Sequence, residues 1–244
     1  MWRNTTRTEQ PSTEPTMNHA LLLVLFVALP DAGQLRQLPG VIEVTANSVE
    51  KPTYRIVQLL NCHWIPEDRF RLDDPTGDYQ GFLDEVEAVQ QEQMAVLRAM
   101  KVRVVFYEGL TAENRAAYQK KIERLRKLKP PKGDSPTDQL VAGFIREDLL
   151  QLGAPGRLLM TGELDAVLPA DDAKLLDAAD PVKEGKIEFN AEAARAREDG
   201  MVRFLLKQKE AVVVMGGAHD LGDKLPAGVE YVRVKTREYK RIVE

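Results

Sequence analysis

The pattern of apolar and polar positions predicts strands and helices that alternate along most of the chain. The stretch "YRIVQLL", residues 54–60, is rich in β-branched and aliphatic residues and predicts a strand. Residues 78–100 place apolar side chains three and four positions apart, which predicts a long amphipathic helix, and a second strand is predicted at 102–107. This order of elements is typical of a parallel βαβ unit.

The later segments continue the alternation. Thr111 and Asn190 are suitable N-caps for two helices, and Gly153 is a suitable C-terminal cap for a third. The strict alternation of "VEYVRVKTREY" favours an edge strand. We therefore expect helices over 111–129, 138–153, 173–180 and 190–208, and strands over 156–161, 211–215 and 229–239.

The predicted elements define the fold class and the domain organisation. Residues 34–244 are expected to form a single three-layer α/β domain, with a mostly parallel central sheet flanked by helices and one antiparallel edge strand. Residues 1–33 are expected to form a polar tail and an apolar, signal-like segment ahead of this domain.

The apolar run "ALLLVLFVALP" is about half as long as a membrane span. Its length fits the hydrophobic region of a secretory signal that starts at Met17, with Ala28, Ala32 and Gly33 as small residues for processing. No Lys or Arg lies between Met17 and the run, and no clean small-x-small triplet follows it. Export to the periplasm or cell surface is therefore favoured by length alone. The alternatives are a buried strand and a cytoplasmic protein.

Composition limits the classes of partner. Hydrophobic residues make up 43% of the 244 residues, enough for a sizeable core. Charged residues make up 30%, but the net charge is only −4 and the cations are scattered among acids, which argues against nucleic acid as a partner. Cys62 is the single cysteine, so neither an internal disulfide nor a zinc site with several thiolates can form. A small molecule or a peptide is the expected substrate, and a homodimer is compatible with the sequence.

Four polar side chains directly follow predicted apolar strands: His63, Glu108, Glu163 and His219. The carboxyl ends of parallel strands form one edge of a sheet, and the loops that leave them form the ligand crevice. Two imidazoles and two carboxylates suit Zn²⁺, Mn²⁺, Fe²⁺ or Co²⁺. Such an ion lowers the pKa of a bound water, while a free carboxylate takes its proton, which is the chemistry of hydrolysis.

Each histidine and glutamate also has an ordinary structural explanation. A lone histidine at a strand end is more often a turn or core residue than a ligand. Glu108 has the position of an acid before a helix N-terminus, where the helix dipole favours it. Glu163 lies in a stretch with Asp165, Asp171 and Asp172, and such clusters are usually solvated loops.

Gly216 and Gly217, which lie between the strand predicted at 211–215 and His219, also have two interpretations. They relieve crowding at a tight turn, or they let a ligand approach the backbone, as a glycine pair does when it cradles phosphate at a helix N-terminus. The full dinucleotide fingerprint is missing.

Several short motifs resemble the superfamily that includes the TraB/Tiki proteins, the erythromycin esterases and the ChaN-type haem-uptake proteins. The resemblance covers about residues 54–237 and suggests a bacterial branch of that group. It is carried by "CHWIPEDRF", "VQQEQM", "YEGL", "GELDAVLPADD", "RAREDGMVRFLL" and "GGAHDL". Members have two GxxH motifs, a glutamate that closes a strand, and an Arg-Asn-x-x-Met motif on a helix. The matching residues here are His63, Glu108, Arg197, Met201, Gly216 and His219.

The resemblance implies a site at the sheet edge, a divalent metal as in the Tiki proteins, hydrolysis as in several members, or haem binding as in another. Two positions depart from the motifs. Leu60 stands where the first GxxH has glycine, and Glu198 replaces the asparagine of the helical motif. An ionised glutamate only accepts hydrogen bonds, so a contact made at Glu198 must differ from that of asparagine.

The leading hypothesis is a metal-assisted hydrolase that acts on a peptide, ester or similar acyl bond. His63 and His219 would bind the metal, Glu108 would be a ligand or general base, Glu163 a second acid or base, and Arg197 would stabilise developing negative charge.

Two other classes remain open. The first is a haem- or metal-binding protein without turnover, in which a histidine is the axial ligand and Trp64, Phe70 and Tyr107 provide the apolar surface. The second is a degenerate domain that serves as an interaction module, which Leu60 and Glu198 favour.

Overall fold

The computed structural model describes residues 28–183 and 185–244. Within them, a six-stranded sheet has the order β1-β8-β2-β7-β3-β4, with β1 antiparallel to β8 and the other neighbours parallel. This confirms the predicted α/β class with one antiparallel edge strand. The strands of the sheet are β1 (Val41–Ala46), β2 (Tyr54–Asn61), β3 (Val104–Tyr107), β4 (Ala166–Pro169), β7 (Glu210–Gly216) and β8 (Val229–Thr236).

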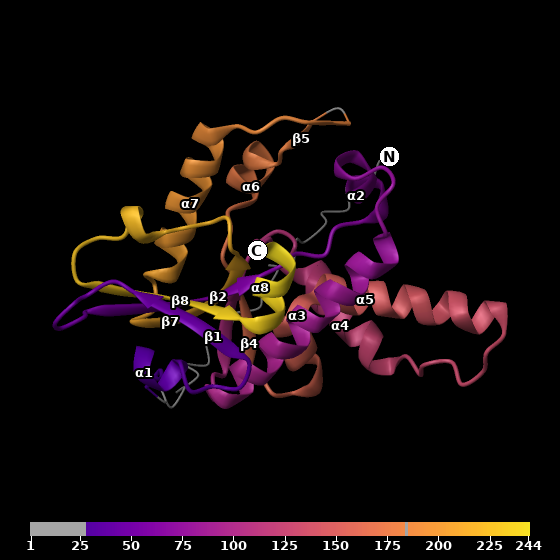
Figure 1. Cartoon of the computed structure of the whole chain (residues 1–244), viewed down its shortest axis with the longest axis horizontal. Helices are drawn as coiled ribbons and strands as arrows, with labels where there is room; N and C mark the ends of the chain where they lie inside the picture. Colours follow the sequence, from indigo (N-terminus) through magenta and orange to yellow (C-terminus); the bar gives the residue numbers. More distant parts are fainter. Residues whose placement is uncertain (1–27, 184) are drawn as a thin grey trace, which may run out of the picture.

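Helices cover both faces of this sheet (Figure 1). One face packs against α1, α3 and α5, and the other packs against α7, with α6 beside it. A small hairpin of β5 (Val182–Lys183) and β6 (Lys186–Ile187) lies apart from the sheet. The helices are α1 (Ala32–Leu35), α2 (Glu67–Asp73), α3 (Tyr79–Ala99), α4 (Arg115–Lys127), α5 (Pro136–Thr161), α6 (Ala173–Ala179), α7 (Ala191–Leu205), the 3₁₀ turn η1 (Gly222–Lys224) and α8 (Arg237–Val243).

The apolar strands are continuous because both faces of the sheet are buried. In β2, Val57 and Leu59 enter the core beneath α3 and α5, whereas Ile56 enters the core beneath α7. A parallel sheet covered on both faces gives such unbroken apolar runs. The predicted strand at 54–60, the long helix at 78–100 and the N-cap at Asn190 are confirmed, the last by a 3.0 Å hydrogen bond from the amide of Ala193.

The alternating strand predicted at 229–239 does not lie at the edge of the sheet, and it ends at Thr236, because helix α8 begins at Arg237. It is β8, which lies between β1 and β2, and the edge strand is β1, which the pattern did not reveal. The charged positions of β8 are only half-buried and form ion pairs, as Glu230 does with Arg55 and Arg233 does with Asp220, both at 3.0 Å. These charges lie on both faces of the strand, so the alternation records partly solvated ion pairs rather than an unpaired edge.

The predicted helix end at Gly153 and the strand at 156–161 are wrong. Helix α5 kinks at Gly153, where φ is 66° and ψ is 177°, then resumes and ends at Thr161 before Gly162. Pro155 lies in the first turn of the resumed helix, a position where its missing N–H costs little. Strand β4 begins only at Ala166, so the segment after Gly162 approaches the sheet from its amino edge.

The kink predicts that Gly153→Ala destabilises the fold. Only glycine readily adopts this backbone conformation, and an added Cβ would overlap the Tyr107 hydroxyl. We expect a loss of about 1–3 kcal/mol in unfolding free energy, measured by urea denaturation. Gly143→Ala, in an open position of the same helix, is the control and should be neutral or stabilising by about 0.5–1 kcal/mol. Equal effects of the two substitutions would contradict this account of the kink.

The start of helix α4 also differs from expectation. Thr111 is not its N-cap, because the helix begins at Arg115 after Asn114. Instead, the Thr111 amide donates to Asn114 Oδ1 at 2.8 Å, and the Asn114 amide donates to the Thr111 hydroxyl at 3.2 Å. These two hydrogen bonds close the loop after β3. This loop carries the chain away from Glu108 and leaves room beside it.

Most of the expected N-terminal segment, residues 1–27, lies outside the described residues, and so does most of its signal-like run. From Leu29 on, the chain contacts the domain, since the Leu29 amide donates to Glu210 and its carbonyl accepts from Arg55. Within the part of the chain that the structure describes, no helix combines the length and apolar character needed to cross a membrane.

Candidate active site

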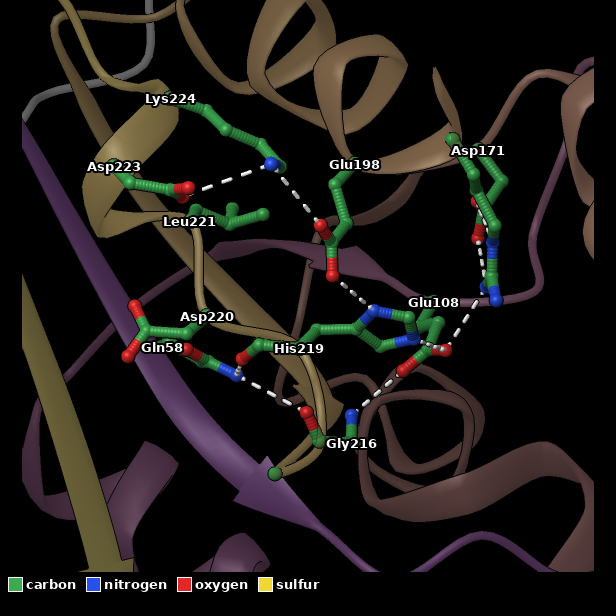
Figure 2. A network of polar contacts seen from close by, with 12 residues as sticks. Gln58, Glu108, Asp171, Glu198, Gly216, His219, Asp220, Leu221, Asp223 and Lys224 are labelled. Carbon is green, nitrogen blue, oxygen red and sulfur yellow. Dashed lines mark hydrogen bonds and ion pairs between the residues drawn. The ribbon is translucent and has the colours of Figure 1, made fainter. Parts of the chain in front are cut away.

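Glu108 is the centre of a polar network at the carboxyl edge of the sheet. It follows β3 directly, its side chain is buried, and both of its oxygens accept two contacts. Oε2 accepts from His63 Nε2 at 2.7 Å and from the Gly216 amide at 2.6 Å. Oε1 accepts from Arg197 at 2.9 Å and faces His219 Nε2 at 3.1 Å. Three distant parts of the sequence therefore meet on one carboxylate. Figure 2 shows the contacts that Gly216 and His219 make with it.

The electrostatics of Glu108 favour its ionised form. Burial raises the pKa of this carboxyl, but electrostatic attraction and a hydrogen bond from His63, a hydrogen bond from His219 and the charge of Arg197 oppose it and hold the pKa well below its usual range. A buried carboxylate with this many donors is a fixed negative charge. Glu108 is therefore a residue that orients its neighbours, since it has no lone pair left for a substrate.

His63 is held in one tautomer by a chain of amides that starts at the backbone. Gln93 donates through Nε2 to the Leu60 carbonyl and to Asn61 Oδ1, both at 2.9 Å. The oxygen of Asn61 is thereby fixed toward Gln93, so its amide nitrogen donates to His63 Nδ1 at 3.1 Å. The proton of a neutral His63 is then on Nε2, which donates to Glu108.

Arg197 is held by two carboxylates. Its Nε and Nη2 donate to Asp171 at 2.7 and 3.0 Å, and Nη2 also donates to Glu108. Asp171 is itself buried and accepts a 2.7 Å hydrogen bond from the Gly109 amide. Among the described residues, Nη1 of Arg197 has no hydrogen-bond partner, so this end of the guanidinium can contact a ligand.

His219 lies between two carboxylates, those of Glu108 and Glu198 (Figure 2). Its Nε2 faces Glu108, and its Nδ1 is 3.0 Å from Glu198, which in turn lies 3.4 Å from the Lys224 ammonium. Both ring nitrogens face carboxylate oxygens, an arrangement that favours the protonated ring. The hydrogen bond to Glu108 raises the pKa of His219 more than burial lowers it, and Glu198 adds to the rise.

The two glycines after β7 permit close approach of side chains rather than of a bound phosphate. A Cβ at Gly216 would lie 2.9 Å from His63 Nε2, and a Cβ at Gly217 would overlap the Tyr239 hydroxyl. The chain then turns through a 3.2 Å hydrogen bond from the His219 amide to the Gly216 carbonyl and enters only the short η1. No long helix starts at these glycines, so this turn lacks the helix N-terminus on which the phosphate interpretation depended.

A cavity of about 840 Å³ opens onto this network. His63, Glu108 and Arg197 line it, whereas His219 does not. The side chain of His63 is 36% exposed, the most accessible part of the network. The other walls come from the loops after β2 and β3 and from α2, α4, α5 and α6. They combine apolar and aromatic residues (Trp64, Tyr107, Leu110, Ala117, Tyr118, Leu150, Leu152, Ala173 and Leu176) with polar ones (Arg69, Thr111, Glu113, Asn114, Lys121, Gln151, Asp177 and Asp180).

Glu163 does not belong to this site. It lies in the turn between α5 and β4, at the opposite end of the sheet, and pairs with Arg98 at 2.5 Å on the surface. Hydrogen bonds from Arg98 and Thr161 lower the pKa of Glu163 to about 2. Its expected place at a strand end depended on the strand at 156–161, which is helical.

Asp171 is the acid that β4 brings to the site, two residues after the strand ends. In the sequence it was visible only as one member of an acidic loop. The run "AVLP" before it was the available signal, since the residues that follow an apolar strand are the ones that reach the carboxyl edge of the sheet.

A divalent metal ion does not fit the donor set in this arrangement. The two imidazole Nε2 atoms are each engaged by a different oxygen of Glu108, and Arg197 brings a positive charge to the same carboxylate. Over residues 28–183 and 185–244, no group of three or more His, Cys, Asp and Glu is placed to hold a metal. The expected metal stays a prediction, which elemental analysis of the purified protein tests.

Haem also stays a prediction. The aromatic residues proposed to contact it are divided between two places, because Trp64 and Tyr107 line the cavity while Phe70 packs on Tyr79 with ring centroids 5.4 Å apart. Either histidine would have to release a hydrogen bond to become an axial ligand. A Soret band on titration with haem, lost in His63→Ala, would identify this activity.

The two departures from the resembled motifs have clear structural roles. Leu60 packs against Val89 and Tyr239 beneath α3 and α8, where a glycine would leave a gap. Glu198 lies 3.0 Å from His219 Nδ1 and contributes to the raised pKa of that ring.

Comparisons of the chain with protein-family models, curated proteins and solved structures found no match.

Proposed function

We propose that the protein is a hydrolase of an ester or a similar acyl bond, with His63 as general base and Arg197 as the group that stabilises the oxyanion. The observation that carries this proposal is that one buried carboxylate, Glu108, orients both residues on the wall of the same cavity. Hydrolysis of an acyl bond requires a general base that activates water and a hydrogen-bond donor that stabilises the oxyanion. His63, oriented by a carboxylate, and the free end of Arg197 match these two requirements.

His63 supplies the proton transfer. Glu108 accepts its Nε2–H, which orients the ring and leaves Nδ1 as the nitrogen that can accept a proton. Water from the cavity displaces the Asn61 amide from Nδ1 and loses a proton to it as its oxygen bonds to the acyl carbon. The tetrahedral intermediate then expels the alcohol, which takes the proton from Nδ1, and the acid product forms.

Arg197 stabilises the charge that develops on the acyl oxygen. Its Nε and Nη2 are held by Asp171 and Glu108, so the guanidinium does not need to reorganise during the reaction. Its Nη1 donors remain for the oxyanion. Preorganised donors of this kind commonly contribute about 10²–10³ in rate.

The test uses the purified full chain and a panel of p-nitrophenyl acyl esters of increasing chain length. We expect His63→Ala to lower kcat/KM by about 10²-fold or more, because general base catalysis is lost. Arg197→Lys should lower kcat with little change in KM, since its role is confined to the transition state. Arg103→Lys, in a surface pair with Asp165, is the matched control and should retain full activity.

The same assay distinguishes the proposal from its alternatives. Activity should survive a chelator; activity lost on chelation and restored by Mn²⁺ or Zn²⁺ would support the metal-assisted mechanism instead. A folded protein that hydrolyses no acyl substrate, or a His63→Ala variant as active as the wild type, would reject the assignment of His63.

A further inference from the structure

The last turns of α4, the loop that follows and the first turns of α5 form a projecting hairpin. We call residues 120–144 the α4–α5 arm. It extends beyond the sheet, away from α6 and α7 (Figure 1). From residue 136 to residue 144 no position of α5 is buried, although the same helix is well packed after Leu150. This stretch of helix therefore receives little support from the domain.

The arm carries an unusual share of the exposed apolar surface. Leu140 and Phe144, one helical turn apart, are 59% and 62% exposed, and Val141 lies beside them on the same stripe. Leu128 is exposed in the loop. Of the nine large apolar side chains that are exposed among the described residues, these four lie in the arm. Such a concentration usually marks an interaction surface.

The arm is also basic, although the chain is acidic. Residues 120–144 contain seven Lys or Arg and three Asp or Glu, whereas the whole chain has a net charge of −4. Lys127, Lys129 and Lys132 are exposed and form no ion pair with a described residue. Exposed apolar side chains and exposed lysines on one projecting arm match the surface of a membrane with anionic headgroups.

We propose that the α4–α5 arm docks on an anionic lipid surface, with Leu140 and Phe144 inserted among the headgroups and the three lysines against lipid phosphates. Association of two copies through this arm would instead bring the same positive charges together. The proposal does not depend on the hydrolytic activity, since none of these residues lines the cavity.

The experiment is cosedimentation of the full chain with phosphatidylcholine vesicles and with vesicles that also contain phosphatidylglycerol. We expect binding to the anionic vesicles only, weakened by salt. The triple variant Lys127→Glu, Lys129→Glu, Lys132→Glu should bind about a hundredfold more weakly. The pair Leu140→Ser, Phe144→Ser should lose most of the binding.

Matched controls keep the result specific to the arm. Phe189→Ser changes an aromatic residue outside the arm that is even more exposed than Phe144, and Lys51→Glu, Lys101→Glu and Lys174→Glu make the same charge change outside the arm. The apolar control should bind as the wild type does, and the charge control should lose far less affinity than the arm variant. Binding to neutral vesicles, binding unaffected by the arm variants, no binding at all, or a dimer that dissociates in the Leu140→Ser, Phe144→Ser pair would each overturn the proposal.

Discussion

Replacement of Glu108 by glutamine is expected to abolish ester hydrolysis and to lower the unfolding free energy by about 3–5 kcal/mol. Each oxygen of Glu108 accepts from two donors, and the amide group of glutamine retains only one oxygen. Its NH₂ group would face donors, while Arg197 and His219 would lose the negative charge between them. Activity should fall by at least about 10²-fold because His63 loses its orientation.

The measurements are kcat/KM for the best ester and urea denaturation followed by circular dichroism. Glu163→Gln is the matched control, because it makes the same substitution in a surface pair with Arg98 that lies at the opposite end of the sheet. It should retain activity and nearly full stability. Wild-type stability in Glu108→Gln would contradict the arrangement of charges described for this site.

The pH dependence of stability gives an independent check on Glu108. The folded pKa of Glu108 lies below its ordinary value of 4.5, so this group stabilises the fold fully above pH 4.5. The contribution disappears as the pH falls from 4.5 through the folded pKa. The acid decline in stability should therefore be shallower in Glu108→Gln than in the wild type.

The sequence was sufficient to predict the fold class because apolar periodicity reports which faces are buried. It identified β2, α3 and α7 from their runs of apolar residues. It did not identify β1, since only one residue of that strand, Val44, is buried. Gly153 does adopt a positive φ, as a helix cap would, but Pro155 starts the next helical segment. Whether residues 156–161 form a helix or a strand depends on their packing against the rest of the domain, which the local sequence pattern does not report.

The site could be predicted only as far as strand ends define it. His63, Glu108 and His219 follow apolar strands, and the parallel sheet brings them together. The amide chain from Gln93 through Asn61 depends on the rotation of α3 against β2, and no spacing in the sequence reports that rotation. For the same reason, the sequence suggested free imidazoles for a metal, whereas the fold directs both of them toward Glu108.

Replacement of His219 is expected to have the second large effect, because this imidazolium separates two carboxylates. In His219→Ala, Glu108 and Glu198 would each lose a cationic partner, and we expect a loss of about 3–5 kcal/mol near pH 6. The folded pKa of His219 lies above 6.5, so its contribution is fully present below pH 6.5 and is lost as the pH rises through the folded value. Wild-type stability should therefore decline on the alkaline side.

Urea denaturation at a series of pH values from about pH 5 to about pH 9 tests this expectation. The alkaline decline should be absent in His219→Ala, while in Glu198→Gln it should shift to lower pH, because one of the two carboxylates that hold the proton is removed. If His219 instead presented a free nitrogen to a metal, protonation would oppose metal binding, and stability of the metal-bound protein would rise with pH. The slope of the alkaline side thus distinguishes an imidazolium from a metal ligand at His219.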